Sequence, residues 1–257
     1  QEKGFIEISG NLGCYLMDHI STCRFFSLPN TKDVGSIDTN EIENKLSGAG
    51  SFFIPIGSNI DDKVKSKFTG GYGIWGGIDR FQIPKCIKKI QNSRIGFLIG
   101  HGEVLPNKKN KVALSNDKDK WNICMPYIEC CWRQNEKEMV LHMQNTINEI
   151  VQIANGEVLP LKDLLNIPFL ESILKDAFAF KEEAPPPGYY IHEVGGAAMG
   201  SSPESSVVDP WNRLWNCSNV LVVDGACWPT SGWQSPTLTM MAITRRACLE
   251  AINSLTE

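Results

Sequence analysis

The sequence predicts a mixed fold of class α/β or α+β, in which an antiparallel sheet with helices precedes a buried strand and a long C-terminal helix. Three observations predict this class. Short apolar runs bounded by turn residues fill positions 51–101, an amphipathic pattern covers 135–155, and the apolar run Val220–Val223 precedes a second helical pattern. Short runs between Gly and Pro are typical of strands, whereas apolar residues three or four positions apart indicate a helix.

The composition is that of a globular chain and excludes several kinds of partner. The 257 residues are 42% hydrophobic and 21% charged, and the net charge is −4. This length supports a sizeable core, and the negative balance gives no general attraction to nucleic acid. No stretch reaches the roughly 18 apolar residues of a membrane-spanning helix, so no span is expected. Because residue 1 is Gln, we expect a piece of a longer protein.

The nine cysteines have an odd count and no CxxC spacing. This pattern argues against a disulfide framework and against a zinc site, so no metal is expected. We expect the cysteines to be small buried hydrophobic residues kept reduced, which favours a reducing compartment such as the cytoplasm.

The predicted elements follow in order along the chain. The runs FFIPIG, IDRFQIP and IGFLIG read as strands, and residues 103–132 as an antiparallel pair around the polar turn SNDKDK. A helix is predicted over 135–155, with Asn135 as N-cap and Gly156 as its stop, and a shorter helix over 161–178. The Pro-rich segment EEAPPPGYY is expected to be a rigid connector.

The last part of the chain is predicted to hold a buried strand and a helix. A continuous apolar run such as Val220–Val223 is typical of a strand covered on both faces. The final helix is expected over about 236–255. Ser235 is its predicted N-cap and Pro236 its first residue, since Ser and Pro are preferred at these positions.

The segment Gly71–Gly76 matches the GxGxxG pattern of dinucleotide-binding turns. Such a turn must follow a buried strand, open a helix and be followed by an acidic residue about twenty positions on. Here a charged segment precedes it and a Pro-containing segment follows, so we interpret it as a Gly-rich loop.

Four histidines are the candidates for acid–base chemistry. His142 lies in the long helical pattern and is expected to pack or face solvent, His101 lies in an expected turn, and His19 is a candidate structural donor. His192 differs, because the small residues of VGGAAMG follow it and leave room for a flat ring or a small substrate.

The blocks HEVGGAAMG and SSVVDPWNRLWNCSNVLVVDGACWPTSGWQSPTLTMMAITRRA resemble the C-terminal signature of the glucose–methanol–choline (GMC) family of flavin oxidoreductases. The earlier segments GNLGCYLMDH and GEVLPNKKNKVAL resemble further family segments. The resemblance implies a joining segment at 1–30 and a substrate-binding domain with an antiparallel sheet and helices at 31–188. Residues 189–257 would supply the active-site loops and the last strand and helix of a Rossmann-like FAD-binding domain. The family's N-terminal FAD-binding half would be missing from this chain and would be its partner.

The resemblance also implies FAD as cofactor and an alcohol or carbohydrate as substrate. His192 corresponds to the family's catalytic base, which accepts the substrate hydroxyl proton while a hydride moves to the flavin. The helix N-terminus would face the flavin ring, where its N–H donors favour hydride acceptance. The implied FAD contacts are Asp224, Gly225, Ala226, Ser235, Pro236 and Thr237.

Two positions depart from the family pattern. Ser235 stands where a second catalytic His or Asn is usual, and Ala198 where Arg is usual. Two alternatives to an oxidoreductase stay open: a GMC-fold lyase acting on hydroxynitriles, and an inactive remnant that binds a sugar or a partner. Four tryptophans near the implied site would suit either sugar stacking or the core: Trp211, Trp215, Trp228 and Trp233.

Overall fold

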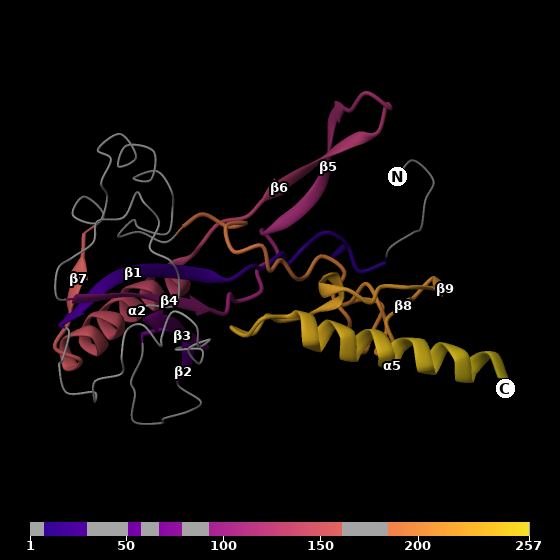
Figure 1. The fold of residues 1–257 in the computed structure, drawn as a ribbon. Coiled ribbons are helices and arrows are strands. Elements are labelled where there is room, and N and C mark those ends of the chain that lie inside the picture. Colours follow the sequence, from indigo (N-terminus) through magenta and orange to yellow (C-terminus); the bar gives the residue numbers. More distant parts are fainter. Residues whose placement is uncertain (1–7, 30–50, 58–66, 79–92, 161–184, 257) are drawn as a thin grey trace. The chain divides into compact units, whose positions relative to one another are not determined.

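The structure is a computed structural model that describes residues 8–29, 51–57, 67–78, 93–160 and 185–256 (Figure 1). The chain divides into two compact units. Unit 1 combines residues 1–20, 103–133 and 186–257, and unit 2 combines 21–102 and 134–185. Each unit therefore brings together segments that are distant in sequence. The domain boundaries inferred from the resemblance stay a prediction.

Unit 2 is built on a five-stranded sheet with the order β2-β3-β4-β1-β7. The β2–β3, β3–β4 and β1–β7 pairs are antiparallel, as predicted for this sheet. The runs FFIPIG and IGFLIG lie in β2 and β4, whereas IDRFQIP lies outside the described residues beyond its first position. The strands are β1 (Ile20–Pro29), β2 (Ser51–Gly57), β3 (Gly71–Ile78), β4 (Ser93–Gly102) and β7 (Glu157–Leu159).

The Gly-rich segment 71–76 is strand β3, so its interpretation as a loop was wrong. The glycines serve strand packing. A Cβ atom on Gly76 would lie 2.3 Å from the carbonyl oxygen of Phe97 on β4, so a larger residue would push the two strands apart. The GxGxxG segment does not begin a helix, and strand packing in the sheet explains its glycines.

Helix α2 (Gln134–Ile153) packs on this sheet through the apolar positions that the sequence pattern identified. Met139 and Met143 are fully buried. A Cβ atom on Gly100 or Gly102 of β4 would lie 3.1 or 2.3 Å from the sulfur of Met143 or Met139, respectively. Glycine at these two strand positions thus lets the helix approach the sheet closely.

The ends of α2 differ slightly from the prediction. The helix begins at Gln134, so Asn135 lies inside it. The Asn135 Oδ1 instead accepts a hydrogen bond of 2.8 Å from the backbone N–H of Thr69. The helix ends at Ile153, and the N–H of Gly156 donates back to the Val151 carbonyl over 2.8 Å. The second helix expected over 161–178 lies outside the described residues.

Unit 1 contains the predicted antiparallel pair as strands β5 (Lys111–Lys118) and β6 (Cys124–Glu129). In Figure 1 they form a long two-stranded ribbon. A second pair joins β8 (Arg213–Leu214) to β9 (Cys217–Leu221). The strand expected at Val220–Val223 therefore exists but ends at Leu221. It is only half-buried in this chain, against the expectation of full burial.

A one-turn 3₁₀ helix, η2 (Gly225–Cys227), and the long helix α5 (Thr237–Thr256) complete unit 1. Helix α5 begins one residue later than predicted. The carbonyl of Pro236 accepts the first helical hydrogen bond, from Met240 N–H over 3.0 Å, so Pro236 and not Ser235 occupies the cap position.

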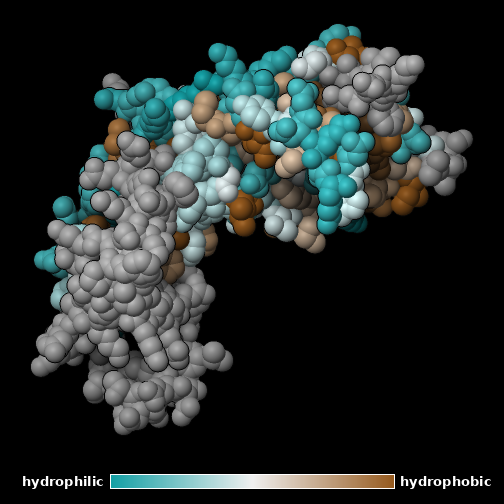
Figure 2. Space-filling model, turned by 90° about the horizontal axis from the view of Figure 1, so that it is seen from above, coloured by the Kyte–Doolittle hydropathy of each residue, from teal (hydrophilic) through white to brown (hydrophobic). Residues whose placement is uncertain are grey.

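The core of unit 1 is the buried cluster Ala197, Val207, Val208 and Cys227, against which Ile243 of α5 packs. Many apolar side chains remain on the surface of the described part, and in Figure 2 brown atoms interrupt its teal polar surface. No helix among the described residues is long and apolar enough to cross a membrane.

The eight cysteines that the structure describes form no disulfide with one another. Of these eight, only Cys23 and Cys227 are buried, whereas Cys131 and Cys248 are exposed. The expectation that the cysteines act mainly as small buried hydrophobic residues was therefore wrong for most of them.

Candidate active site

The segment Val194–Met199 forms the centre of the candidate site, because it is hydrogen-bonded along both of its edges. On one edge, Val194 exchanges two backbone hydrogen bonds of 2.8 and 2.9 Å with Met17. On the other edge, its N–H groups donate to the carbonyls of residues 225–227 over 2.8–2.9 Å. The structure thus brings together three segments singled out in the sequence: GNLGCYLMDH, HEVGGAAMG and DGAC.

This close approach of backbones depends on glycine. Gly195 has φ +88°, a left-handed conformation that side chains disfavour, and a Cβ there would lie 2.1 Å from the carbonyl oxygen of Tyr15. Only a residue without a Cβ fits, so the first glycine of the GG pair is required by the fold of the site.

Gly225 marks the point where α5 meets this segment. A Cβ on Gly225 would lie 2.5 Å from Met240 Cε of α5, 2.9 Å from Val194 Cγ1 and 3.1 Å from the Glu193 carbonyl oxygen. The residues that follow His192 and the first turn of α5 therefore both touch Gly225. Packing within the protein is enough to explain why this position is a glycine. A contact between Gly225 and FAD stays a prediction.

The neighbouring Asp224 is exposed and Ala226 is half-buried. The Asp224 Oδ1 accepts a hydrogen bond of 2.9 Å from the Ala226 N–H and thereby caps η2. The carboxylate thus fixes the shape of the loop in which the expected FAD contacts lie.

His192 is half-buried and is surrounded by two other rings. Its ring centroid lies 5.0 Å from that of His19 and 5.3 Å from that of Tyr190, both with edge-type geometry. Its Nδ1 is buried and has no hydrogen-bond partner among the described residues. The imidazole is therefore held by ring packing, while this nitrogen is not occupied by a neighbouring group.

The remaining histidines take structural positions. His142 Nδ1 lies 2.7 Å from the Tyr72 hydroxyl, so His142 has the packing role expected for it. His101 lies in the strand β4 and is buried, so its assignment to a turn was wrong.

A hollow of about 390 Å³ lies at the beginning of α5. Ser235, Trp228 and Met199 contribute to its lining, and His192 does not. The Trp228 indole N–H is buried without a partner among the described residues. Thr237 begins α5 and is exposed. The first N–H groups of a helix have no acceptor within it, so the hollow opens beside backbone donors.

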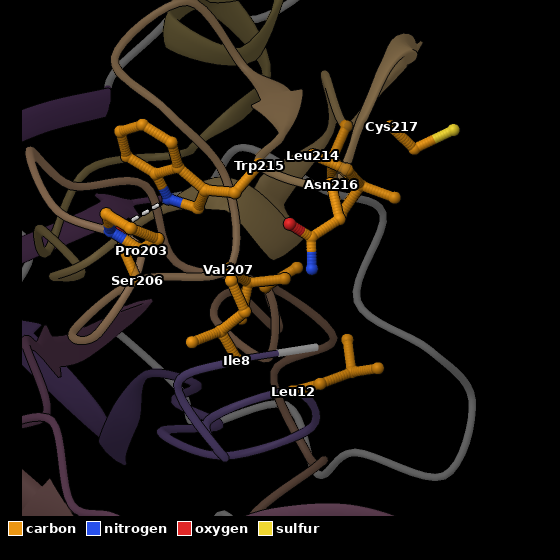
Figure 3. Close-up of a pocket in the computed structure, with 11 residues that line it drawn as sticks. Ile8, Leu12, Pro203, Ser206, Val207, Leu214, Trp215, Asn216 and Cys217 are labelled. Atoms are coloured by element: carbon orange, nitrogen blue, oxygen red, sulfur yellow. Dashed lines mark hydrogen bonds between the residues drawn. The ribbon is translucent and has the colours of Figure 1, made fainter. Parts of the chain in front are cut away.

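A second, apolar hollow of about 200 Å³ lies at the turn between β8 and β9 (Figure 3). Trp215 borders it, and the Trp215 indole N–H donates to Ser206 Oγ over 2.9 Å. Ile8 and Leu12 stand at its edge and are about half exposed. None of the site residues expected from the sequence lines this hollow.

The four tryptophans do not share one place. Trp215 lines the second hollow and Trp228 the first, whereas Trp211 is exposed with the Arg246 guanidinium 5.4 Å from its ring centre. Trp233 lines neither hollow. The described chain therefore presents no common stacking platform built from all four.

Comparison with known proteins identifies the class to which this fold and site belong. The model of the GMC oxidoreductase family matches residues 106–244, which is more than half of the chain. The chain therefore belongs to the GMC oxidoreductase family, whose members are generally FAD-binding flavoproteins.

Two curated relatives match almost the whole chain. A 2-methyl-1,2-propanediol dehydrogenase of Mycolicibacterium austroafricanum is 26% identical over 95% of this chain and 42% of its own length. A fructose dehydrogenase large subunit of Gluconobacter japonicus is 28% identical over 98% of this chain and 43% of its own length. The chain thus spans less than half the length of these relatives.

Among solved structures, a pyridoxine 4-oxidase from Mesorbium loti matches 93% of this chain and 43% of its own chain, with a TM-score of 0.53 and 17% identity. This likeness shows the fold. It agrees with the expected antiparallel sheets and helices of a GMC C-terminal half.

Proposed function

We propose that the full-length protein is an FAD-dependent oxidoreductase that oxidises a CH–OH group of an alcohol or a sugar. The family supports the reaction class, and the names of the two long relatives refer to a diol and to a sugar. The observation that carries the proposal is the His192 imidazole, whose Nδ1 lacks a partner among the described residues. His192 lies three residues before Gly195, the first residue that is hydrogen-bonded to the DGAC loop.

His192 acts as the base in this proposal. A neutral imidazole is suited to this role near pH 7, and it would accept the proton of the substrate hydroxyl. A positioned base typically contributes about 10²–10⁴ in rate.

The residues present fit a flavin. The hollow at α5 combines helix N–H donors with a buried Trp228 N–H that has no partner in the described part of the chain. Donors of this kind suit an electron-rich ring. We assign Ser235, Pro236 and Thr237 to the ring, and Asp224, Gly225 and Ala226 to the rest of the cofactor. When bound, FAD supplies the acceptor for the hydride.

Ser235 holds the second position at the site. Its hydroxyl can donate to or accept from a substrate oxygen, but it cannot serve as a base at neutral pH. Ala198, where the family usually has Arg, brings no charge. His192 is therefore the principal acid–base group of the proposal.

The N-terminal half of the full-length protein is the proposed partner of this chain. Helix α5 exposes the apolar residues Leu238, Met241, Leu249 and Ile252 along one side. Strand β9 is only half-buried, and Ile8 and Leu12 are exposed beside the second hollow. Exposed apolar area of this extent marks an interaction surface.

Flavin bleaching tests the proposed activity. The full-length protein, supplied with FAD, is mixed without oxygen with a panel of diols and sugars, and absorbance near 450 nm is followed. The proposal predicts a yellow protein that at least one CH–OH compound bleaches. A yellow protein that cleaves hydroxynitriles without bleaching would identify the lyase alternative, and a colourless protein would identify the inactive remnant.

A further inference from the structure

Asp18 is a buried carboxylate with no role in the proposed reaction so far. Its side chain is 2% exposed. Its two carboxylate oxygens accept four backbone hydrogen bonds. Oδ1 accepts from the N–H of His19 over 2.7 Å and of His192 over 3.1 Å. Oδ2 accepts from the N–H of Gly188 over 3.0 Å and of Tyr190 over 3.3 Å.

The four donors belong to His192 itself, to residues just before it and to a residue in ring contact with it. Three of them belong to residues 188–192, and the fourth belongs to His19, whose ring contacts the His192 ring. Tyr190, another donor, supplies the second ring against His192. One buried carboxylate therefore holds the backbone of His192 and of both rings that contact its imidazole.

The conformation that Asp18 holds is a strained one. Ile191, between the bonded residues Tyr190 and His192, has φ +55° and is 75% exposed. A β-branched residue in the left-handed region is a genuine outlier, and such a residue persists only where its surroundings impose it. Because the Ile191 side chain is mostly exposed, its own packing does not impose this conformation, and the bonds on either side do.

We infer that Asp18 is a positioning residue, which fixes the His192 imidazole at the reacting centre by binding the backbone of residues 188–192. The inference rests on the proposed role of His192 as base. Asp18 touches neither the imidazole nor the substrate in this account. It acts through the backbone, and its removal would let residues 188–192 relax from the imposed turn.

The test is a double-mutant cycle in the full-length holoenzyme, comparing wild type, Asp18→Asn, His192→Ala and the double variant. An Asn side chain keeps one acceptor oxygen but presents an NH₂ group to the other pair of N–H donors. Displacement of a catalytic group by about 1 Å can cost about 10²-fold. We expect Asp18→Asn to slow flavin reduction ten- to hundredfold at saturating alcohol, with FAD content and substrate affinity little changed.

The decisive outcome is that the effects of the two substitutions on the rate do not add. The double variant should be no slower than His192→Ala, because an Ala side chain cannot accept a proton wherever its backbone lies. Three results would overturn the inference and leave the proposed function standing. They are a double variant in which the two single losses of rate multiply, a loss of FAD in Asp18→Asn, and an unchanged rate in Asp18→Asn while His192→Ala is slow. An unchanged rate in His192→Ala would instead refute the proposed role of His192.

Two further measurements keep the inference falsifiable. Asp209→Asn is the matched control, since Asp209 Oδ1 accepts both the Trp211 and the Arg213 N–H, and the amide retains one such oxygen. It should change the rate of flavin reduction less than twofold.

If Asp18→Asn does not fold, hydrogen exchange of the wild-type protein tests the inference instead. The amides of residues 188, 190 and 192 must exchange far more slowly than exposed loop amides, and rapid exchange would contradict the inference.

Discussion

The backbone N–H of His192 donates to Asp18 Oδ1 over 3.1 Å, although the two residues are 174 positions apart in the chain. This bond joins the Asp-His end of GNLGCYLMDH to the start of HEVGGAAMG. It lies within two residues of the paired backbones of Met17 and Val194, so the backbone of the candidate base is fixed to the centre of the candidate site.

The strain at Ile191 predicts an unusual stabilising substitution. Asn tolerates the left-handed region and Ile does not, and a non-Gly residue there costs about 1–3 kcal/mol. Because the side chain is 75% exposed, little packing is lost. Ile191→Asn should raise the free energy of unfolding by about 1 kcal/mol in urea denaturation. The β-branched control Ile191→Val should give no gain, and a less stable Asn variant would contradict the strain.

Two glycines of similar conformation should respond differently to alanine. Gly195 and Gly188 have φ +88° and +85°, but a Cβ on Gly195 would meet the Tyr15 oxygen at 2.1 Å, whereas nothing lies within 4 Å of one on Gly188. Gly188→Ala should cost about 1–2 kcal/mol from its backbone conformation alone. Gly195→Ala should cost more than about 3 kcal/mol, because the two backbones must separate. Equal losses in urea denaturation would show that the close approach is not real.

The buried thiols should resist alkylation. Burial raises the pKa of Cys23 to about 12, against a smaller opposing effect of Arg24, and burial also raises the pKa of Cys227. A raised pKa keeps the thiol neutral at pH 8, and only the thiolate reacts. Iodoacetamide followed by mass spectrometry should label the exposed Cys131 at least about tenfold faster than Cys23 or Cys227. Equal rates in the native protein would contradict this burial.

Cys248 tests whether a partner covers α5. It is exposed on this helix, as are Met241 and Leu249. If the N-terminal half packs on this side, Cys248 should be labelled in residues 1–257 expressed alone and protected in the full-length protein. Equal labelling in both would show that α5 stays uncovered.

The position of Ser235 predicts a gain of function. Ser has a shorter reach than the Asn or His usual there, and it lies in the hollow at the start of α5. Ser235→Asn should raise the rate of flavin reduction in the full-length protein, whereas Ser235→Ala should not. A slower Asn variant would show that this site is shaped for Ser.

Local patterns predicted much of the fold. The spacing of Met139, Met143 and Ile147 identified α2, since a long run of apolar residues at this spacing is typical of an amphipathic helix. The ten-residue strand β1 was not predicted, because its polar Ser21 and Thr22 are buried and break the alternation. The ends of the helices differed from the prediction by one or two residues, and the Asn135 side chain, expected to cap α2, instead accepts a hydrogen bond from the Thr69 N–H.

The site was predictable only in part. His192 could be singled out because small residues follow it in the sequence. Asp18 could not be assigned a role, because its partners at Gly188, Tyr190 and His192 are backbone groups 170–174 positions away. A carboxylate that binds backbone N–H groups leaves no side-chain pattern in the sequence, and only the folded chain reveals it.

Single-turnover flavin reduction in the full-length protein, with wild type compared with His192→Ala, tests the central claim most directly. The account predicts that the variant keeps its FAD and that reduction by the alcohol slows at least about a hundredfold, through loss of the base. A variant that retains FAD and is reduced at the wild-type rate would contradict the account.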